Sequence, residues 1–257
     1  MSIFDSIILG IVEGITEFLP ISSTAHLIMT STALGLEQTE FIKSFEIAIQ
    51  LGAILSVFVL YWRSFFDMRI LVRLAIAFAP TAVVGLLLYP FAKAYLIGNE
   101  MLVVWTLALG GTALILFEVW HKETEQETEP SMHDITYLQA FCVGLFQTIA
   151  IVPGVSRSAA TIVGGLLVGI RRIAVVEFSF LLAVPTMLAA TGLDLFQTAA
   201  VFTGRDIIML AVGFAVSFVV ALASIRWLLH FIRAHTFIPF GVYRIIIAGL
   251  FLLLIIS

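Results

Sequence analysis

The chain has 257 residues, of which 61% are hydrophobic and 12% charged, and its net charge of −4 without a basic run argues against nucleic acid as a partner. Its mean hydropathy of +1.13 lies outside the range of soluble globular domains, so the composition indicates an integral membrane protein. Its long apolar runs lack the two-residue alternation of a membrane β-barrel, so we expect an all-α polytopic fold.

In chain order, we predict six membrane-spanning helices and two interrupted helical stretches. The interrupted stretches cover 3–35, which contains LPISSTAH, and 137–170, which contains VPGVSRSAAT. Because proline and a hydroxyl cluster break each stretch, we predict two re-entrant helical hairpins, each with a cavity at its break. The six spans are apolar runs long enough to cross a ~30 Å hydrocarbon core. They lie at 45–62, 70–90, 101–120, 178–199, 206–229 and 238–256.

The two halves of the chain share one order of elements, an interrupted stretch followed by three spans. At an offset of 134 residues, Gly10 and Glu13 fall on Gly144 and Gln147. Three spans are an odd number, so the second copy must enter the membrane upside down relative to the first. We therefore predict a single membrane domain, 1–257, made of two inverted repeats, about 1–122 and 135–257, joined by an acidic linker at 123–134.

The basic residues of the short loops predict the orientation, because cytoplasmic loops are enriched in Lys and Arg. Both termini are then outside, the first hairpin enters from the outer face and the second from the cytoplasm. The predicted cytoplasmic set is Arg63, Arg69, Arg73, Lys122, Arg171, Arg172, Arg226 and Arg233, against Lys43, Lys93 and Arg205 outside.

Glu13 and Glu17 lie at the deep end of the first hairpin's first arm. A charged side chain near the bilayer centre costs ~2.5–3.5 kcal/mol, so two of them need a reason to be there. Their i, i+4 spacing places both carboxylates on one helical face. Hard oxygen ligands so arranged suit Mg²⁺ or Ca²⁺ held together with substrate phosphates. The alternative is a buried, protonated pair that only packs the helices.

After Pro20 the chain must restart a helix, and Ser22, Ser23 or Thr24 is suited to cap it. The free N–H groups and positive dipole end of this helix then point toward the carboxylates and form an anion site. His26 lies within the first turn and could exchange a proton with a serine or a leaving oxygen. The alternative for His26 is a packing role.

The second break adds hydroxyl groups and an arginine. Its Pro–Gly pair permits a sharp turn, and Ser156, Ser158 and Thr161 offer hydroxyl and N-cap groups. The planar guanidinium of Arg157 matches phosphate oxygens in bidentate fashion. A merely structural arginine at this depth would need a buried acid, and one of the two glutamates could be that acid.

Two carboxylates, a candidate hydroxyl nucleophile, a histidine, an arginine and two helix N-termini are the parts of a phosphoryl-transfer site. Because this site is expected inside a membrane domain, its substrate is most simply a lipid phosphate.

The stretches EGITEFLPISSTAH at 13–26 and PGVSRSAAT at 153–161 resemble the two signature motifs of the undecaprenyl pyrophosphate phosphatase, or bacitracin-resistance, family of bacterial inner membranes. The likeness covers essentially the whole chain, including EFSFLLAVPTM at 177–187 and FIPFGVYR at 237–244. It implies hydrolysis of C55 polyprenyl pyrophosphate to the monophosphate at the outer face, which recycles the lipid carrier of cell-wall synthesis. It also implies a divalent-cation requirement and an inverted-repeat fold.

The matching motif positions also imply residue roles. Glu13 and Glu17 take the metal and acid–base roles, Ser23 that of nucleophile, and His26 that of proton transfer. Arg157 becomes the phosphate clamp. The residues expected to line the site are Ser22, Thr24, Ser156, Ser158 and Thr161. The motifs leave open whether Ser23 forms a phosphoenzyme or orients a metal-activated water.

An alternative function is an inverted-repeat transporter or flippase for an anionic or lipid-phosphate substrate. An anion carrier has little use for two acids beside its anion, whereas a metal-assisted phosphatase needs them. A purely structural scaffold would leave several intramembrane charges without function. The expected partners are the polyprenyl pyrophosphate and membrane lipid, and the sequence leaves the oligomeric state open, with a homodimer as one candidate.

Overall fold

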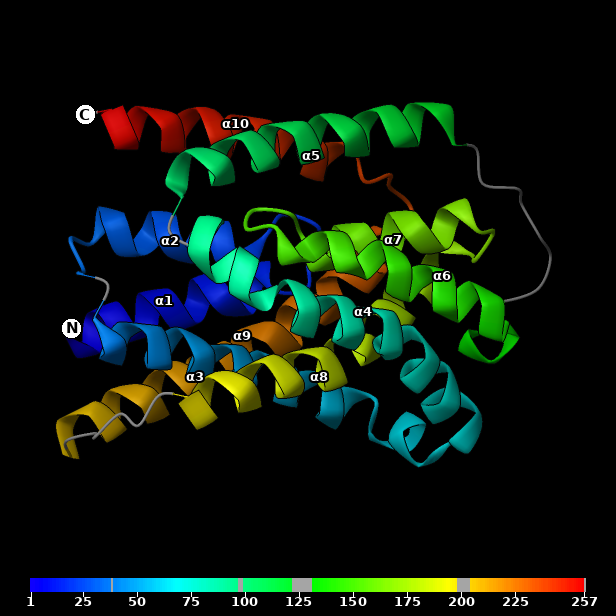
Figure 1. Ribbon diagram of the computed structural model, residues 1–257, viewed down its shortest axis with the longest axis horizontal. Helices are drawn as coiled ribbons and strands as arrows, with labels where there is room; N and C mark the ends of the chain where they lie inside the picture. The colour runs from blue at the N-terminus through cyan, green and yellow to red at the C-terminus, as the bar shows by residue number, and fades with distance from the viewer. Residues whose placement is uncertain (38, 97–98, 122–130, 198–203, 257) are drawn as a thin grey trace.

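The computed structural model describes residues 1–37, 39–96, 99–121, 131–197 and 204–256. Within these ranges the chain folds into helices joined by short turns, with no strand (Figure 1). The α-helices are α1 (Ile3–Thr16), α2 (Ser23–Ala33), α3 (Glu40–Leu60), α4 (Met68–Tyr95), α5 (Glu100–Trp120), α6 (Tyr137–Gln147), α7 (Arg157–Leu167), α8 (Arg172–Gln197), α9 (Gly204–Phe231) and α10 (Ile238–Ile256). Short 3₁₀ helices cover Trp62–Phe66, Met132–Asp134 and Thr148–Ile151.

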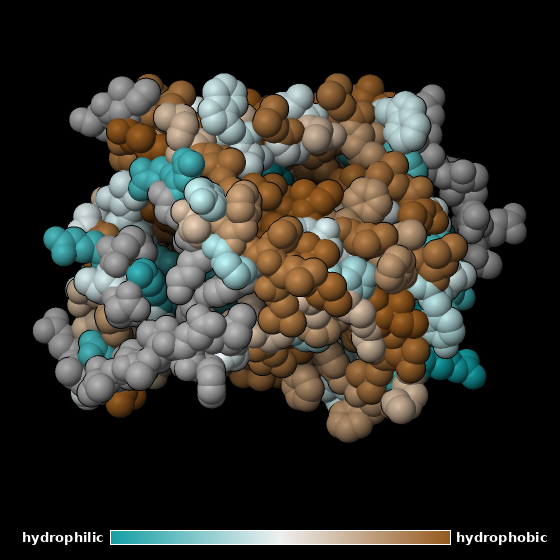
Figure 2. All heavy atoms as spheres, viewed as in Figure 1, coloured by the Kyte–Doolittle hydropathy of each residue, from teal (hydrophilic) through white to brown (hydrophobic). Residues whose placement is uncertain are grey.

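Six of these helices are long and apolar enough to cross a membrane, which confirms the predicted spans. The qualifying segments are Phe41–Leu60, Met68–Leu88, Glu100–Trp120, Arg172–Gly192, Asp206–Phe231 and Ile238–Ile255. Large apolar side chains such as Leu86, Leu87 and Leu109 are exposed on them. Figure 2 shows apolar side chains across the middle of one face and hydrophilic ones toward its two ends, as expected for a surface in contact with lipid. The chain is therefore a multi-pass membrane protein.

Both interrupted stretches fold as two helices joined by a turn. The α1–α2 hairpin begins and finishes at the end of the molecule that holds both termini, and the α6–α7 hairpin begins and finishes at the opposite end (Figure 1). Their turns meet in the interior, where Ser158 Oγ donates a hydrogen bond of 2.7 Å to the Leu19 carbonyl. Polar groups from distant parts of the sequence are thereby brought together.

Small residues let the first arm of each hairpin pack closely on a long helix. Helix α1 packs on α9, and a Cβ on Gly10 would lie 2.8 Å from the carbonyl oxygen of Gly213. Helix α6 packs on α4, and a Cβ on Gly144 would overlap the carbonyl oxygen of Ala77. Only glycine permits helix backbones to approach so closely. The arms are thus held firmly at the positions from which the turns extend.

Helices α5 and α10 lie side by side along one edge of the molecule (Figure 1). The fully buried Arg244 of α10 connects them to both turns. Its Nη1 donates to the Pro20 carbonyl at 3.4 Å, and its Nη2 donates to the Gly154 carbonyl at 3.2 Å and the Thr106 carbonyl at 3.1 Å. One side chain therefore fixes the position of the first turn, the second turn and α5 relative to one another.

Candidate active site

The first turn has an unusual backbone at Ser22. This residue has a φ of +72° and is the only residue other than glycine with a positive φ among those the structure describes. Such a conformation costs of order 1–3 kcal/mol and is typical of ligand-binding sites. Ser22 precedes α2 as its N-cap, but its side chain makes no capping hydrogen bond, contrary to the expectation that a hydroxyl caps this helix. Uncapped N–H groups at the start of a helix suit an anion.

The second turn follows the expected pattern more closely. Gly154 has a φ of +85°, which a residue with a side chain rarely adopts. Ser156 caps α7, since its Oγ accepts a hydrogen bond of 3.2 Å from the backbone N–H of Ala159. The N-terminus of α7 thus carries Arg157 as its first residue, directed toward the first turn.

Glu17 connects the two turns through both of its carboxylate oxygens. Ser23 Oγ donates to Glu17 Oε2 at 2.6 Å, and Arg157 Nη2 donates to Glu17 Oε1 at 2.9 Å. The other terminal nitrogen of Arg157 donates to the Ser179 carbonyl at 2.9 Å. In this geometry Arg157 is the ion-pair partner of a buried acid, the alternative that the sequence left open. A serine hydroxyl bonded to a carboxylate is also the arrangement of an activated nucleophile and its base.

Glu13 lies one helical turn before Glu17 and is completely buried. Neither of its carboxylate oxygens has a hydrogen-bond partner among the described residues. Unlike Glu17, it is not among the residues of the cavity wall. An acid so placed requires either a proton or a cation.

His26 faces α10 rather than Ser23. Its Nδ1 lies 2.7 Å from the Ser22 carbonyl oxygen and its Nε2 lies 2.9 Å from the Tyr243 hydroxyl. The carbonyl can only accept, so Nδ1 donates, and in the neutral ring Nε2 accepts from Tyr243. Tyr243 is a partner that the sequence analysis did not identify, although it belongs to the FIPFGVYR stretch.

Two of the expected phosphate-binding hydroxyls make structural hydrogen bonds instead of facing the cavity. Ser158 Oγ bonds to the Leu19 carbonyl, and Thr161 Oγ1 lies 2.6 Å from Ser179 Oγ. Both residues are buried, and neither belongs to the cavity wall. The Ser158 contact joins the two turns, and the Thr161 contact joins α7 to α8.

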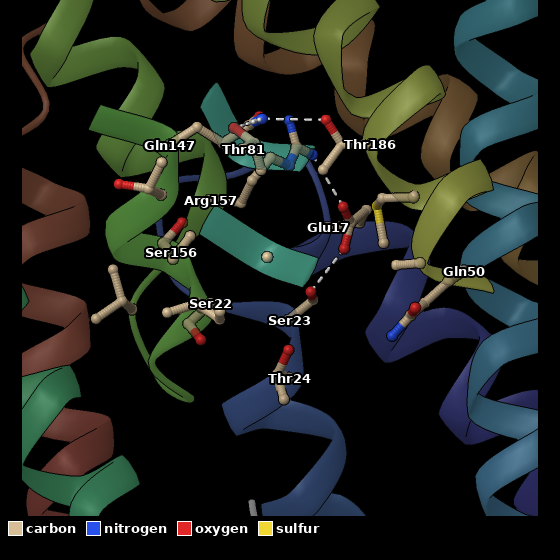
Figure 3. A pocket seen from close by; sticks show the side chains of 17 residues that line it. Glu17, Ser22, Ser23, Thr24, Gln50, Thr81, Gln147, Ser156, Arg157 and Thr186 are labelled. Carbon is tan, nitrogen blue, oxygen red and sulfur yellow. Dashed lines mark hydrogen bonds and ion pairs between the residues drawn. The ribbon is translucent and has the colours of Figure 1, made fainter. Parts of the chain in front are cut away.

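A cavity of about 330 Å³ opens between the turns (Figure 3). This volume is within the range of ~300–1,000 Å³ typical of small-molecule sites. Of the predicted site residues, its wall includes Glu17, Ser22, Ser23, Thr24, Ser156 and Arg157. The wall also includes polar residues that the sequence analysis missed, namely Gln50 of α3, Thr81 of α4, Gln147 at the end of α6, Thr148 directly after it and Thr186 of α8. The offset of 134 residues between Glu13 and Gln147 was the one signal that pointed to any of them.

The fold and the cavity together define a class, a multi-pass helical membrane protein with a polar pocket suited to an anion between two interior turns. A family model described as "Bacitracin resistance protein BacA" matches residues 6–250, and the chain belongs to this family. The chain is 50% identical over 253 residues to an undecaprenyl-diphosphatase of Sulfurihydrogenibium sp. (strain YO3AOP1), covering 98% of this chain and 99% of that protein.

Two further relatives bear the same name. The undecaprenyl-diphosphatase of Aquifex aeolicus is 47% identical over 96% of each chain. That of Wolinella succinogenes is 47% identical over 98% of each chain. The similarity therefore extends over the whole length of the chain, including both hairpins.

Proposed function

We propose that this protein is a membrane phosphatase that hydrolyses undecaprenyl (C55) pyrophosphate to undecaprenyl phosphate and inorganic phosphate. The family and the names of the relatives support this activity. The structural observation that carries it is the hydrogen-bonded set of Ser23, Glu17 and Arg157 at the wall of a cavity among apolar helices. In a bacterium the reaction recycles the lipid carrier for peptidoglycan synthesis and confers resistance to bacitracin.

The proposed chemistry uses Ser23 as the nucleophile. Its Oγ attacks the terminal phosphorus while Glu17 accepts its proton, the bond from that phosphorus to the bridging oxygen breaks, and undecaprenyl phosphate leaves. Water then hydrolyses the phosphoserine and regenerates the hydroxyl. In the second route, Glu17 accepts a proton from a water that Ser23 orients, and no phosphoenzyme forms. The 2.6 Å hydrogen bond from Ser23 to Glu17 supports the first route.

The remaining groups bind phosphate or hold the site in place. Arg157 retains further N–H groups for phosphate oxygens beyond the two that bond Glu17 and Ser179. Ser22, Thr24 and Ser156 line the cavity and contribute hydroxyl groups. His26 fixes the Ser22 carbonyl, and its role in proton transfer stays a prediction.

We further propose that a divalent cation, Mg²⁺ or Ca²⁺, acts at this site. The two unpartnered carboxylate oxygens of Glu13, one turn from Glu17, fit such a group. The described residues contain no cluster of three or more His, Cys, Asp or Glu ligands, so substrate phosphates would complete the coordination shell. When bound, the cation would neutralise charge on the pyrophosphate.

The two hairpins are proposed to be re-entrant and to belong to two inverted repeats within one membrane domain. The paired contacts of α1 with α9 and of α6 with α4 support this, as does the close glycine approach at both Gly10 and Gly144. The proposed boundary between the repeats lies in the linker at 123–134, of which residues 123–130 are outside the described ranges.

The cavity is proposed to open to the periplasmic or outer face of the bacterial inner membrane. The connections that carry the predicted cytoplasmic arginines lie at the end of the molecule opposite to the termini, in keeping with the positive-inside rule (Figure 1). Lys122 lies outside the described residues, and the side chains of Lys93 and Arg205 are likewise not described. A homodimer in the membrane remains a proposal without a structural observation of its own.

Release of inorganic phosphate from undecaprenyl pyrophosphate by the purified protein in detergent tests the function. Ser23→Ala is expected to keep less than about a tenth of kcat, a loss above ~1.4 kcal/mol, while lipid binding persists. Ser224→Ala is the matched control, because among the described residues that hydroxyl bonds only to the Val220 carbonyl of its own helix. A phosphoenzyme trapped by rapid quenching would support the covalent route, and a milder loss in Ser23→Ala would favour the water route.

Binding of the lipid without any phosphate release by the wild type would instead indicate the transporter. The close pairing of a carboxylate with a hydroxyl in the cavity wall argues against that alternative, since an anion carrier gains nothing from an acid beside its anion.

A further inference from the structure

Gln147 lines the cavity, and the proposed mechanism does not use it. It ends α6, is 1% exposed, and lines the cavity with Thr81 and Thr186. Its Nε2 donates to Thr81 Oγ1 at 2.8 Å and to Thr186 Oγ1 at 3.1 Å (Figure 3). The amide nitrogen is thus held between two hydroxyl groups from two different helices.

The neighbouring hydrogen bonds fix which end of the amide is which. Thr81 Oγ1 donates its proton to the Gly144 carbonyl at 3.2 Å, and Thr186 Oγ1 donates its proton to the Leu182 carbonyl at 2.8 Å. While each hydroxyl donates its single proton to its carbonyl, both threonine oxygens accept from Gln147. The amide nitrogen therefore lies between the threonines, and Oε1 is the other end of the amide.

Oε1 of Gln147 is a buried acceptor that no described residue supplies with a hydrogen bond. Leaving such an atom unpaired costs about 1–3 kcal/mol, and each instance in a folded protein calls for an explanation. Because the residue is part of a cavity wall, a ligand in the cavity can supply the donor.

The other polar groups of the cavity wall indicate which kind of ligand would carry that donor. Arg157 and the uncapped start of α2 donate hydrogen bonds and suit anionic oxygens. An amide oxygen repels an anionic oxygen but accepts from O–H. A phosphate group satisfies both kinds of site, since its second pKa is about 6 and one oxygen can retain a proton while the others are charged.

We infer that Gln147 Oε1 forms a subsite for a proton-bearing phosphate oxygen, so that the cavity recognises a monoprotonated phosphate group and discriminates against a fully ionised oxyanion. The inference rests on the proposed function, which places a phosphate in this cavity. It also explains why the two halves of the chain differ at equivalent positions. The acid at Glu13 suits a cation, whereas a neutral acceptor at Gln147 suits a hydroxyl group.

Inhibition of lipid hydrolysis by inorganic phosphate and by sulfate tests the subsite, because phosphate keeps at least one proton near neutral pH and sulfate keeps none. For the wild type, the inhibition constant of sulfate should exceed that of phosphate by at least about tenfold. In Gln147→Met, which retains length and packing but has no carbonyl, the ratio should fall to about twofold or less. Thr186→Val disturbs the same cluster but leaves the Gln147 carbonyl and the hydrogen bond from Nε2 to Thr81, so its ratio should stay close to that of the wild type.

Several outcomes would overturn the inference. If the wild type shows a sulfate-to-phosphate ratio of inhibition constants near unity, the inference is wrong. This measurement needs no variant, so it decides the question even if Gln147→Met does not fold. A lower kcat in Gln147→Met with an unchanged ratio would mean that Oε1 positions water instead of phosphate. If the wild type hydrolyses the lipid but shows no preference, the subsite alone is wrong. If it neither hydrolyses the lipid nor responds to phosphate, the proposed function fails as well.

Discussion

Arg157 contacts two parts of the site at once, and its planar fork leaves further N–H groups for a phosphate. Nη2 reaches Glu17 and Nη1 reaches the Ser179 carbonyl. Lysine carries the same charge but has a single nitrogen, so it cannot hold Glu17 and the Ser179 carbonyl and also bind phosphate. For Arg157→Lys we expect a fall in kcat/KM of at least about tenfold, or ~1.4 kcal/mol, measured as phosphate release.

The matched control is Arg226→Lys, because Arg226 is exposed on α9. It should retain wild-type kinetics. Near wild-type activity in Arg157→Lys would show that a single positive charge beside Glu17 is sufficient and that bidentate geometry is irrelevant.

Glu13 is the residue whose environment most directly predicts a cation. Its buried carboxylate lacks hydrogen-bond partners, so Glu13→Gln removes a charge without breaking a described contact. If Glu13 holds Mg²⁺ or Ca²⁺, the cation concentration for half-maximal activity should rise at least about tenfold. Excess chelator should abolish turnover of the wild type, and added cation should restore it.

The control for this substitution is Glu37→Gln, an exposed carboxylate in the connection after α2. An unaltered cation requirement in Glu13→Gln would assign Glu13 to helix packing, and full turnover in chelator would remove the cation from the proposal.

At the scale of elements, the sequence predicted the helices better than it predicted the cavity. The spans follow from length and hydropathy, and Pro20 and Pro153 mark both turns. Thr81 and Thr186 were missed because they lie inside regular apolar helices, where a threonine usually bonds its own backbone. Only the packing of α4, α6 and α8 brings both hydroxyls to the amide nitrogen of Gln147.

Tertiary packing also explains why the positions of Ser22, His26 and Arg157 were predicted but their contact partners were not. Local spacing placed all three near the turns, but it could not reveal that His26 bonds Tyr243, which is 217 residues distant. Nor could it choose between phosphate and Glu17 as the partner of Arg157, since that choice depends on how the two turns meet. The residue types were predictable from local chemistry, and their pairing required the tertiary structure.

Helix α4 forms one side of the cavity and offers a position at which it can be filled without disturbing the fold. Gly85 lines the cavity, and a Cβ there would meet no atom within 4 Å. Gly85→Trp should therefore fold but obstruct the lipid, lowering kcat/KM for the long-chain substrate by at least about tenfold. The control is Gly249→Trp on α10, where a Cβ likewise meets no atom within 4 Å. Equal activity of the two variants would show that the substrate does not use the space beside Gly85.

At the scale of the whole molecule, the cavity has to be reached from one side of the membrane. The start of α1 and the ends of α2, α4 and α10 lie at one end of the molecule, and the α3–α4 and α9–α10 connections lie at the other (Figure 1). The second end carries the excess of basic residues, so it is expected in the cytoplasm. The first hairpin, which supplies Glu17 and Ser23, then enters from the outer face.

Cysteines at the two ends of α3 provide a direct test of this orientation. Lys43 lies in the first turn of α3 and Arg63 just beyond its last turn, and both are exposed. In a Cys142→Ala background, which removes the single native cysteine, Lys43→Cys should react with an impermeant maleimide in intact spheroplasts, whereas Arg63→Cys should react only after permeabilisation. Because both positions flank one helix, differences in expression or folding cannot mimic the pattern if both variants hydrolyse the lipid. The reverse pattern would place the first hairpin on the cytoplasmic side, and the lipid pyrophosphate would then have to cross the membrane before it is hydrolysed.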